Sequence, residues 1–250
     1  MSQVAGLVPL ALLLALLPAS PSARDFLWGA VAGLAGSTGV ALLYRALAIG
    51  TMSLVAPTTA VCAVMIPVLA DALAGERLPA VTMAGIALAL VAIVLIGQQN
   101  STPGDRPLAT RRALPPGIAL AFLSGVAIGL FFLSLARTGA AAGLWPLLAA
   151  RTLSGVLFGA VALVRRQSMR MPRPVMRTAI ACGVVDMLAN ALYVLASRGG
   201  PLSVVVTLSS LYPASTVVLA RLVVGERLSR VQAVGIVCAL VAVVMIVSGT

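Results

Sequence analysis

The sequence contains no histidine and no lysine, and charged residues make up only 9% of its 250 positions. The lack of histidine excludes a Ser-His catalytic dyad and the common zinc sites. Three cysteines are present without C-x-x-C spacing, and neither a P-loop nor a G-x-S-x-G motif occurs. We therefore expect a protein that is not an enzyme and that uses no cofactor and no metal.

The scarcity of charge also argues against a soluble domain. Hydrophobic residues make up 61% of the chain, and the mean hydropathy is +1.12. The formal net charge of +11 comes from 17 arginines against six acidic residues. These arginines mark loop ends and do not cluster on one solvated face, so nucleic-acid binding is not expected. The composition instead indicates an integral membrane protein.

Apolar runs of about 20 residues, the length that crosses a bilayer core of roughly 30 Å, recur along the chain. They are apolar all round and lack the alternation of a membrane β-barrel, and lipid offers no partner to open backbone groups. The sequence therefore predicts an all-α, polytopic bundle of about nine membrane helices. The expected spans are 3–18, 26–47, 53–72, 79–97, 116–136, 141–164, 176–197, 201–223 and 230–248.

An internal repeat is visible from the loop sequence GERL, which occurs at residues 75–78 and again at 225–228. An ungapped comparison of residues 41–100 with residues 191–250 gives 22 identities in 60 positions. Biased composition alone would give about a tenth. Because the second half contains five spans, an odd number, the two copies cross the membrane in opposite directions, as in the inverted repeats of secondary transporters.

The repeat register predicts a first repeat at residues 1–99, a polar linker at 100–115 and a second repeat at 116–250. At the offset of 150 residues, the span 116–136 has no counterpart in the first repeat. We therefore expect two inverted five-helix repeats with the first helix missing. A start inside a longer reading frame and a genuine nine-helix variant both explain this, and we favour the first. A cleaved signal peptide is less favoured, because no basic residue precedes the first apolar run.

Each half contains an apolar helix that leads into GERL and then a final helix of Gly, Ala, Val and Ile, as in YPASTVVLARLVVGERLSRVQAVGIVCALVAVVMI at residues 212–246. This pattern resembles the drug/metabolite transporter superfamily, specifically the EamA-type membrane proteins. The resemblance implies ten helices, a central cavity and transport of small metabolites or drugs, often as export. The first copy has Ala63 where the second has Pro213. With Pro57 and Pro67 instead, its helix break is expected elsewhere.

The distribution of arginine predicts an orientation, because cytoplasmic loops are enriched in basic residues. Twelve arginines lie in one set of alternate loops, and four (Arg24, Arg77, Arg137 and Arg198) lie in the other. This count places the linker in the cytoplasm and the first GERL loop and the C-terminus outside. The resemblance implies instead that both chain ends lie in the cytoplasm.

One acidic residue, Asp186, lies in the middle of an apolar span. A charge at that depth costs at least about 2.5–3.5 kcal/mol on insertion scales, so such a residue usually faces a cavity or a partner. Asn190 and Tyr193 follow at four and seven residues, which places all three on one helix face. We favour a functional role in a polar stripe. A protonated Asp186 that only packs against a neighbouring helix is the alternative.

Arg151 is the one arginine outside the loop groups. Its guanidinium stays charged and must find an anion or reach the membrane surface by snorkelling. Asp186 is the expected partner, and snorkelling has equal weight. A substrate carboxylate that competes for Arg151 would let Asp186 take up a proton and would couple proton flux to substrate binding.

Smaller polar side chains are further candidates for the cavity lining, although hydroxyls in membrane helices more often bond their own backbone. The assigned substrate- or proton-binding residues are Asp186, Asn190, Tyr193, Arg151, Tyr44, Ser37, Thr58, Thr59, Thr207 and Tyr212.

GERL has a structural explanation, because glycine ends a helix in a left-handed turn and a carboxylate is favoured near the next helix start. The structural loop residues are Gly75, Glu76, Arg77, Gly225, Glu226 and Arg227.

These observations predict a secondary carrier that moves a small metabolite or drug by alternating access, with proton-coupled export as one mode. The expected partners are the small-molecule substrate, protons and the lipid bilayer; a homodimer is left open. The expected location is the plasma membrane, as a multi-pass protein. The alternative is a membrane assembly or scaffold protein that transports nothing. A polar cavity around Asp186 and Arg151 favours the carrier, and a solid apolar centre favours the scaffold.

Overall fold

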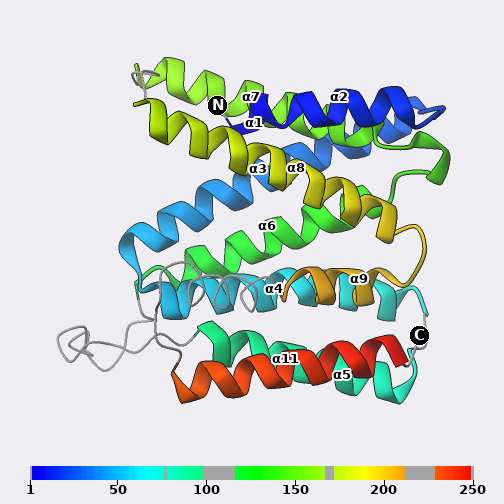
Figure 1. Cartoon of the computed structure of the whole chain (residues 1–250), viewed down its shortest axis with the longest axis vertical. Helices are drawn as coiled ribbons and strands as arrows, with labels where there is room; N and C mark the ends of the chain where they lie inside the picture. The colour runs from blue at the N-terminus through cyan, green and yellow to red at the C-terminus, as the bar shows by residue number, and fades with distance from the viewer. Residues whose placement is uncertain (1, 76–77, 98–115, 167–171, 212–228, 249–250) are drawn as a thin grey trace. The chain divides into compact units, whose positions relative to one another are not determined.

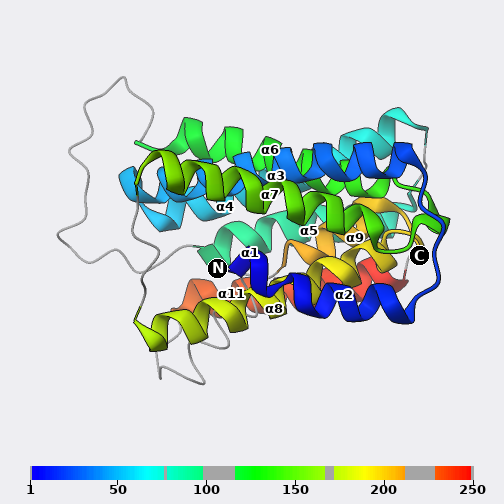
Figure 2. The same cartoon turned by 90° about the horizontal axis from the view of Figure 1, so that it is seen from above.

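The computed structural model describes residues 2–75, 78–97, 116–166, 172–211 and 229–248, and every regular element among these residues is helical (Figures 1 and 2). The elements are α1 (Ser2–Ala5), α2 (Leu7–Leu16), α3 (Ala23–Ile49), α4 (Met52–Leu73), α5 (Ala80–Gly97), α6 (Ile118–Ala136), the 3-10 helix η1 (Ala140–Ala142), α7 (Trp145–Val164), α8 (Arg173–Ala196), α9 (Leu202–Ser209) and α11 (Arg230–Ser248). The predicted all-α fold is confirmed.

The helices correspond closely to the predicted spans. Among the described residues, six helices are long and apolar enough to cross a membrane: α3, α4, α6, α7, α8 and α11. Two shorter apolar stretches, Gln3–Leu16 and Ala80–Ile96, match the first and fourth predicted spans. The first of these is divided at Gly6 between α1 and α2. The predicted span 201–223 begins as α9, and its remainder lies outside the described residues.

The expectation of a helix break in the first copy is wrong. Helix α4 runs without interruption from Met52 to Leu73 with Pro57 and Pro67 inside it. A proline removes one backbone hydrogen bond, and membrane helices tolerate this where neighbouring helices and side chains satisfy the freed carbonyl. The corresponding position of the second copy, Pro213, lies outside the described residues.

The distribution of side-chain size fits a bilayer environment. Many fully buried positions hold alanine, for example Ala89 and Ala242, which have no exposed surface. Large aliphatic side chains such as Leu73, Val164 and Val8 are more than 70% exposed. In lipid the outer surface gains nothing from polarity, and small interior residues let helices approach closely. The chain is therefore a multi-pass membrane protein.

Two compact units are defined by the contacts within the chain. Unit 1 comprises residues 1–38 and 130–200, and unit 2 comprises residues 39–129 and 201–250. Each unit therefore takes helices from both predicted repeats. The division into repeats at the linker 100–115 stays a prediction from the sequence.

At one end of unit 1, side chains tie the connections between helices together. The Asp25 carboxylate, in the first turn of α3, accepts a hydrogen bond of 2.7 Å from the backbone N–H of Gly139, between α6 and α7. Arg198, just after α8, donates to the carbonyl of Gly143. Burial lowers the pKa of the Arg198 guanidinium, and the nearby Asp25 carboxylate acts in the opposite sense. These bonds bring the three connections together at one end of unit 1, in agreement with the alternation of the predicted loops.

The clearest evidence for the repeat register lies in unit 2, where α5 and α11 pack along each other (Figure 1). A Cβ atom added at Gly85 would lie 2.8 Å from Cγ1 of Ile246, and one added at Gly235 would lie 2.8 Å from Cγ1 of Ile96. Gly235 and Ile246 are the positions 150 residues after Gly85 and Ile96. The two contacts are thus reciprocal, as a two-fold axis between equivalent elements produces. They run from the start of one helix to the end of the other, so α5 and α11 are antiparallel.

A second contact in unit 2 joins the end of α4 to the start of α9. The carboxylate of Asp71, only 8% exposed, accepts a hydrogen bond of 2.6 Å from the backbone N–H of Ser203. A carboxylate at a helix N-terminus satisfies an otherwise unpaired donor and opposes the helix dipole. The contact also brings the connection after α4 to the same face as the connection before α9.

Candidate functional site

A charged cluster forms in unit 1 where α1, α7 and α8 meet. The guanidinium of Arg151, on α7, forms an ion pair with the carboxylate of Asp186 on α8. It also donates a hydrogen bond of 2.7 Å to Oε1 of Gln3 on α1 and approaches Sδ of Met187 at 3.3 Å. The packing of α1 and α2 against α8 positions Gln3 for this role. The guanidinium thus has three different partners.

The two charged side chains differ sharply in exposure. The side chain of Arg151 is 10% exposed, whereas that of Asp186 is 58% exposed. Asn190, one turn further along α8, donates to the backbone carbonyl of Asp186 at 2.7 Å and lies 3.3 Å from its Oδ1. One carboxylate oxygen therefore contacts Arg151, and the carboxylate as a whole opens to one side of unit 1.

Tyr193, the third residue of the predicted stripe, lies against protein. It is only 5% exposed, and its hydroxyl donates to the carbonyl of Phe132 on α6 at 3.1 Å. The two rings pack with their centroids 4.6 Å apart. Tyr193 thereby fixes α8 against α6 within unit 1, one turn beyond the amide of Asn190.

The position along the helices places the ion pair inside the apolar layer. Arg151 is six residues from the start of α7, which corresponds to about 9 Å at 1.5 Å per residue. Asp186 is ten residues from the end of α8, or about 15 Å. The Arg151 guanidinium points toward α8 and pairs with Asp186, which confirms the predicted ion pair. Arg151 therefore does not snorkel to the membrane surface in this structure. A half-exposed carboxylate at this depth needs water or a polar partner on its open side.

Ser37 takes part in a helix contact of unit 1. Its hydroxyl donates to the carbonyl of Gly33 at 2.6 Å, and its oxygen lies within hydrogen-bond distance of the Ser154 hydroxyl, at 2.8 Å. Ser154 lies three residues after Arg151 on α7, and both serines are buried. This polar contact joins α3 to α7 one turn from the ion pair, on the same face of α7.

The other predicted polar residues that the structure describes belong to unit 2. Thr58 and Thr207 bond the carbonyls four residues before them, at 2.7 and 2.6 Å, and Thr59 bonds the carbonyl of Ala121 on α6 at 3.1 Å. Tyr44 is 69% exposed on α3. Tyr212 lies outside the described residues.

The structural role of GERL is visible at Gly75 alone. This glycine follows α4 with φ of +82°, the left-handed conformation expected of a glycine that ends a helix. The remaining loop residues lie outside the described part of the chain: Glu76, Arg77, Gly225, Glu226 and Arg227.

Sequence reasoning did not identify Gln3 and Met187, which contact Arg151, or Ser154, which contacts Ser37. Gln3 is the first polar side chain of the first apolar span, a signal of the same kind that identified Arg151. Ser154 follows Arg151 at a spacing of three residues, which places both on one helix face. Met187 carried no signal, because methionine is an ordinary apolar residue in a membrane helix.

The chain is similar to known proteins both in sequence and in fold. The profile of the EamA-like transporter family matches residues 115–248, more than half of the 250 residues. Nineteen chains of solved structures match. One, titled "Crystal structure of protein", has a TM-score of 0.63 at 15% identity, covering 98% of this chain and 94% of that one. This likeness concerns the fold alone. A search of curated proteins found no match.

The family match extends over the second predicted repeat, which contains Arg151, Asp186 and Asn190. It agrees with the resemblance seen in the sequence, with the helical fold and with the apolar outer surface. The family points to a transporter and not to an enzyme. The chain belongs to the EamA-like transporter family and is a multi-pass membrane transporter of small solutes.

Proposed function

We propose that the chain is a secondary carrier of the plasma membrane that exports a small metabolite or drug by alternating access, coupled to protons through Asp186. The observation that carries this proposal is the ion pair between Arg151 and Asp186 inside the apolar layer. A scaffold has no need of it, because apolar side chains of similar size stabilise a bundle at least as well. The family membership supports transport, and the pair supplies the coupling.

The unequal exposure of the two partners suggests how the pair would operate. Arg151 is enclosed by Gln3, Met187 and Asp186, so its charge is held in a fixed place. Asp186 opens to one side, where a proton or a substrate could reach it. A substrate carboxylate that binds Arg151 displaces Asp186, and the released carboxylate then takes up a proton because its cationic partner is lost. Departure of the substrate restores the pair and releases the proton on the same side, so substrate and proton cross the membrane together and export follows the outward gradient of the substrate.

Asn190 and Tyr193 would have supporting roles in this cycle. The amide of Asn190 contacts the free carboxylate oxygen of Asp186 and can hold the carboxyl group in either protonation state. Tyr193 holds the same stretch of α8 against α6 through its bond to Phe132. The serine pair Ser37 and Ser154 would keep Arg151 at a constant depth by joining α7 to α3.

The test compares cells that express the full chain, its Asp186→Asn and Asp186→Glu variants, or no protein. Metabolites inside and outside the cells are measured at two external pH values. Asparagine keeps the shape of aspartate and loses the titratable proton, so we expect the variant to lose pH-dependent export when export is normalised to the amount of protein measured in the membrane. Glutamate should restore part of the pH dependence.

Two results would contradict the proposal. Export with an unchanged pH dependence in the Asp186→Asn variant would show that Asp186 does not couple protons. Metabolite profiles that are identical with and without the unaltered protein would favour the scaffold alternative. Membrane fractionation of the same cells tests the plasma-membrane location.

A further inference from the structure

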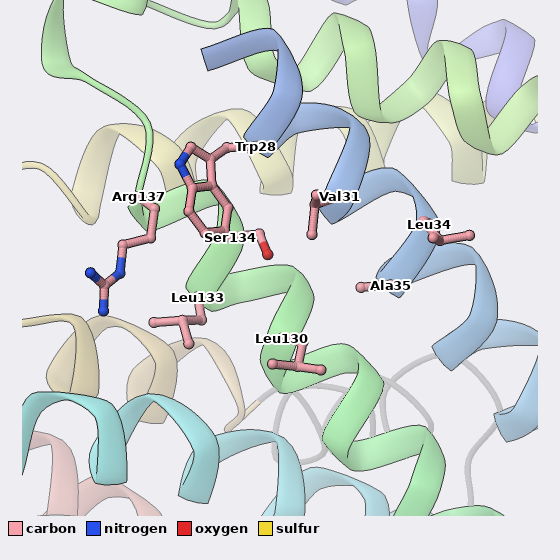
Figure 3. A pocket seen from close by; sticks show the side chains of 8 residues that line it. All are labelled: Trp28, Val31, Leu34, Ala35, Leu130, Leu133, Ser134 and Arg137. Carbon is pink, nitrogen blue, oxygen red and sulfur yellow. The ribbon is translucent and has the colours of Figure 1, made fainter. Parts of the chain in front are cut away.

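A groove in unit 1 lies apart from the ion pair, between the first part of α3 and the last part of α6 (Figure 3). Its volume is about 610 Å³. The lining residues are Trp28, Val31, Leu34, Ala35, Leu130, Leu133, Ser134 and Arg137. Apart from Ser134 and the two residues at one end, Trp28 and Arg137, every one of them is aliphatic.

The groove is long and narrow along the two helices. The residues on α3 run from Trp28 to Ala35, seven positions or about 10 Å along the axis. Those on the other side run over the same number of positions, from Arg137, just after α6, back to Leu130 on α6. Val31, Leu34 and Leu130 are 41–54% exposed. The groove therefore extends about a third of the way into a hydrocarbon core of roughly 30 Å.

One end of the groove lies at the membrane surface and is basic. Figure 3 shows Trp28 and Arg137 at this end and Leu34 and Ala35 at the other. The surface position follows from the hydrogen bond between Asp25 and Gly139, which joins the start of α3 to the connection after α6. Tryptophan is enriched at this level of the bilayer, where its ring meets the headgroups.

A second guanidinium lies at the same end. Arg24 precedes Trp28 by four residues on α3, and residues at that spacing share a helix face. Arg24 and Arg137 are both exposed. In the part of the chain that the structure describes, the single ion pair is the one between Arg151 and Asp186, so no carboxylate of the described residues lies within 4 Å of either guanidinium. The nearby Asp25 carboxylate is already bonded to Ser22 and Gly139.

We propose that this groove binds a phospholipid with an anionic headgroup. One acyl chain lies between α3 and α6, the phosphodiester lies between Arg24 and Arg137, and the Trp28 indole contacts the glycerol region. A phospholipid fits because an apolar slot that enters the hydrocarbon layer lies beside two exposed arginines at the headgroup level. A soluble anion would leave the apolar slot empty, and an apolar solute would leave the cations without a partner. The inference does not depend on the proposed proton coupling.

Trp28 provides a local readout for the test, because Trp145 is the one other tryptophan of the chain. The full chain with Trp145→Phe is purified in detergent, and lipids with brominated acyl chains, which quench a tryptophan they touch, are added. We expect saturable quenching of Trp28 by brominated phosphatidylglycerol and weaker quenching by brominated phosphatidylcholine. Glycerol phosphate should not displace the lipid, which distinguishes a lipid headgroup from a free phosphate.

Variants separate the headgroup contact from the acyl-chain contact. Arg24→Gln and Arg137→Gln should each weaken phosphatidylglycerol binding about fivefold, with little change for phosphatidylcholine. The matched control Arg45→Gln removes an exposed arginine near the other end of α3 and should leave quenching unchanged. Ala35→Phe fills the groove and should abolish quenching by both lipids, with Ala35→Leu as a milder variant if the first does not fold.

Three results would overturn the proposal. Quenching that does not saturate would show that no lipid occupies the groove. Equal quenching by the two lipids, unchanged in both arginine variants, would show that the headgroup is not recognised. Full displacement by glycerol phosphate or by an apolar solute would assign the groove to a different ligand.

Discussion

The ion pair of Arg151 and Asp186 should contribute measurably to stability, and its contribution should be unequal between the partners. Asp186→Asn removes the negative charge and keeps the shape, which leaves the enclosed guanidinium without a counter-ion, beside the neutral groups of Gln3 and Met187. Arg151→Met removes the positive charge and keeps most of the length of the side chain. Asp186 then retains Asn190 and can take up a proton on its open side.

The exposures decide the size of each effect. Removing one partner of a fully buried pair costs about 3–5 kcal/mol, whereas exposed pairs contribute about 0–1 kcal/mol. Arg151 is 10% exposed and Asp186 58% exposed, so this pair lies between the two limits. We expect Asp186→Asn to lower the free energy of unfolding by about 2 kcal/mol and Arg151→Met to lower it by about 1 kcal/mol.

A double-mutant cycle isolates the interaction from other effects of each change. Unfolding of the full chain in mixed micelles is followed for the unaltered protein, the two single variants and the double variant. Once either partner is gone, the second change should cost little, which gives a coupling free energy of about 1–2 kcal/mol. The control cycle combines Arg151→Met with Asp25→Asn, whose hydrogen bonds lie at the membrane surface, and should give no coupling.

A coupling free energy below about 0.5 kcal/mol would refute the reasoning, because additive changes indicate independent sites. So would a larger loss of stability for Arg151→Met than for Asp186→Asn. That order would mean that an unpaired carboxylate destabilises the fold more than an unpaired guanidinium does.

Three further predictions concern the fold. Gly85→Leu and Gly235→Leu should each destabilise the chain by about 1–3 kcal/mol and by similar amounts, since their contacts are reciprocal; a clearly unequal pair of unfolding free energies would contradict the two-fold relation. Asp71→Ala should cost about 1 kcal/mol through the lost bond to Ser203, and unchanged thermal unfolding would contradict this. Ala140→Cys in a cysteine-free background should react with an impermeant maleimide from outside the cell, and labelling only after lysis would reverse the orientation predicted from the arginine count.

The sequence predicted the helical framework well because membrane helices leave a strong and simple signal. Spans of suitable length were visible from hydropathy, since lipid excludes open backbone groups. The register of 150 residues was visible from identities alone, and the reciprocal contacts of Gly85 and Gly235 agree with it. The division of the first span at Gly6 into α1 and α2 was not predicted, because hydropathy does not report a local turn of the backbone.

The polar site was only partly predictable, for a physical reason. Helical spacing identified the face of α8 that carries Asp186 and Asn190. The spacing within one helix does not show which neighbouring helix that face contacts. Tyr193 shares that spacing and yet packs against Phe132. The roles of hydroxyl side chains were harder still to predict. A threonine such as Thr207 donates to the carbonyl four residues earlier, so its presence in a membrane helix does not indicate a cavity.

The two copies also differ at the position of the ion-pair carboxylate. In the repeat register, Asp186 corresponds to Gly36, and a Cβ atom at Gly36 would lie 2.9 Å from the ring of Phe131 on α6. The first copy thus uses this position for close helix packing, and the second copy uses it for a charge paired with Arg151. By contrast, the glycines of α5 and α11 keep the same role in both copies. Duplication explains the shared helix contacts, and the divergence at a single packed position accounts for an ionisable group that occurs in one copy only.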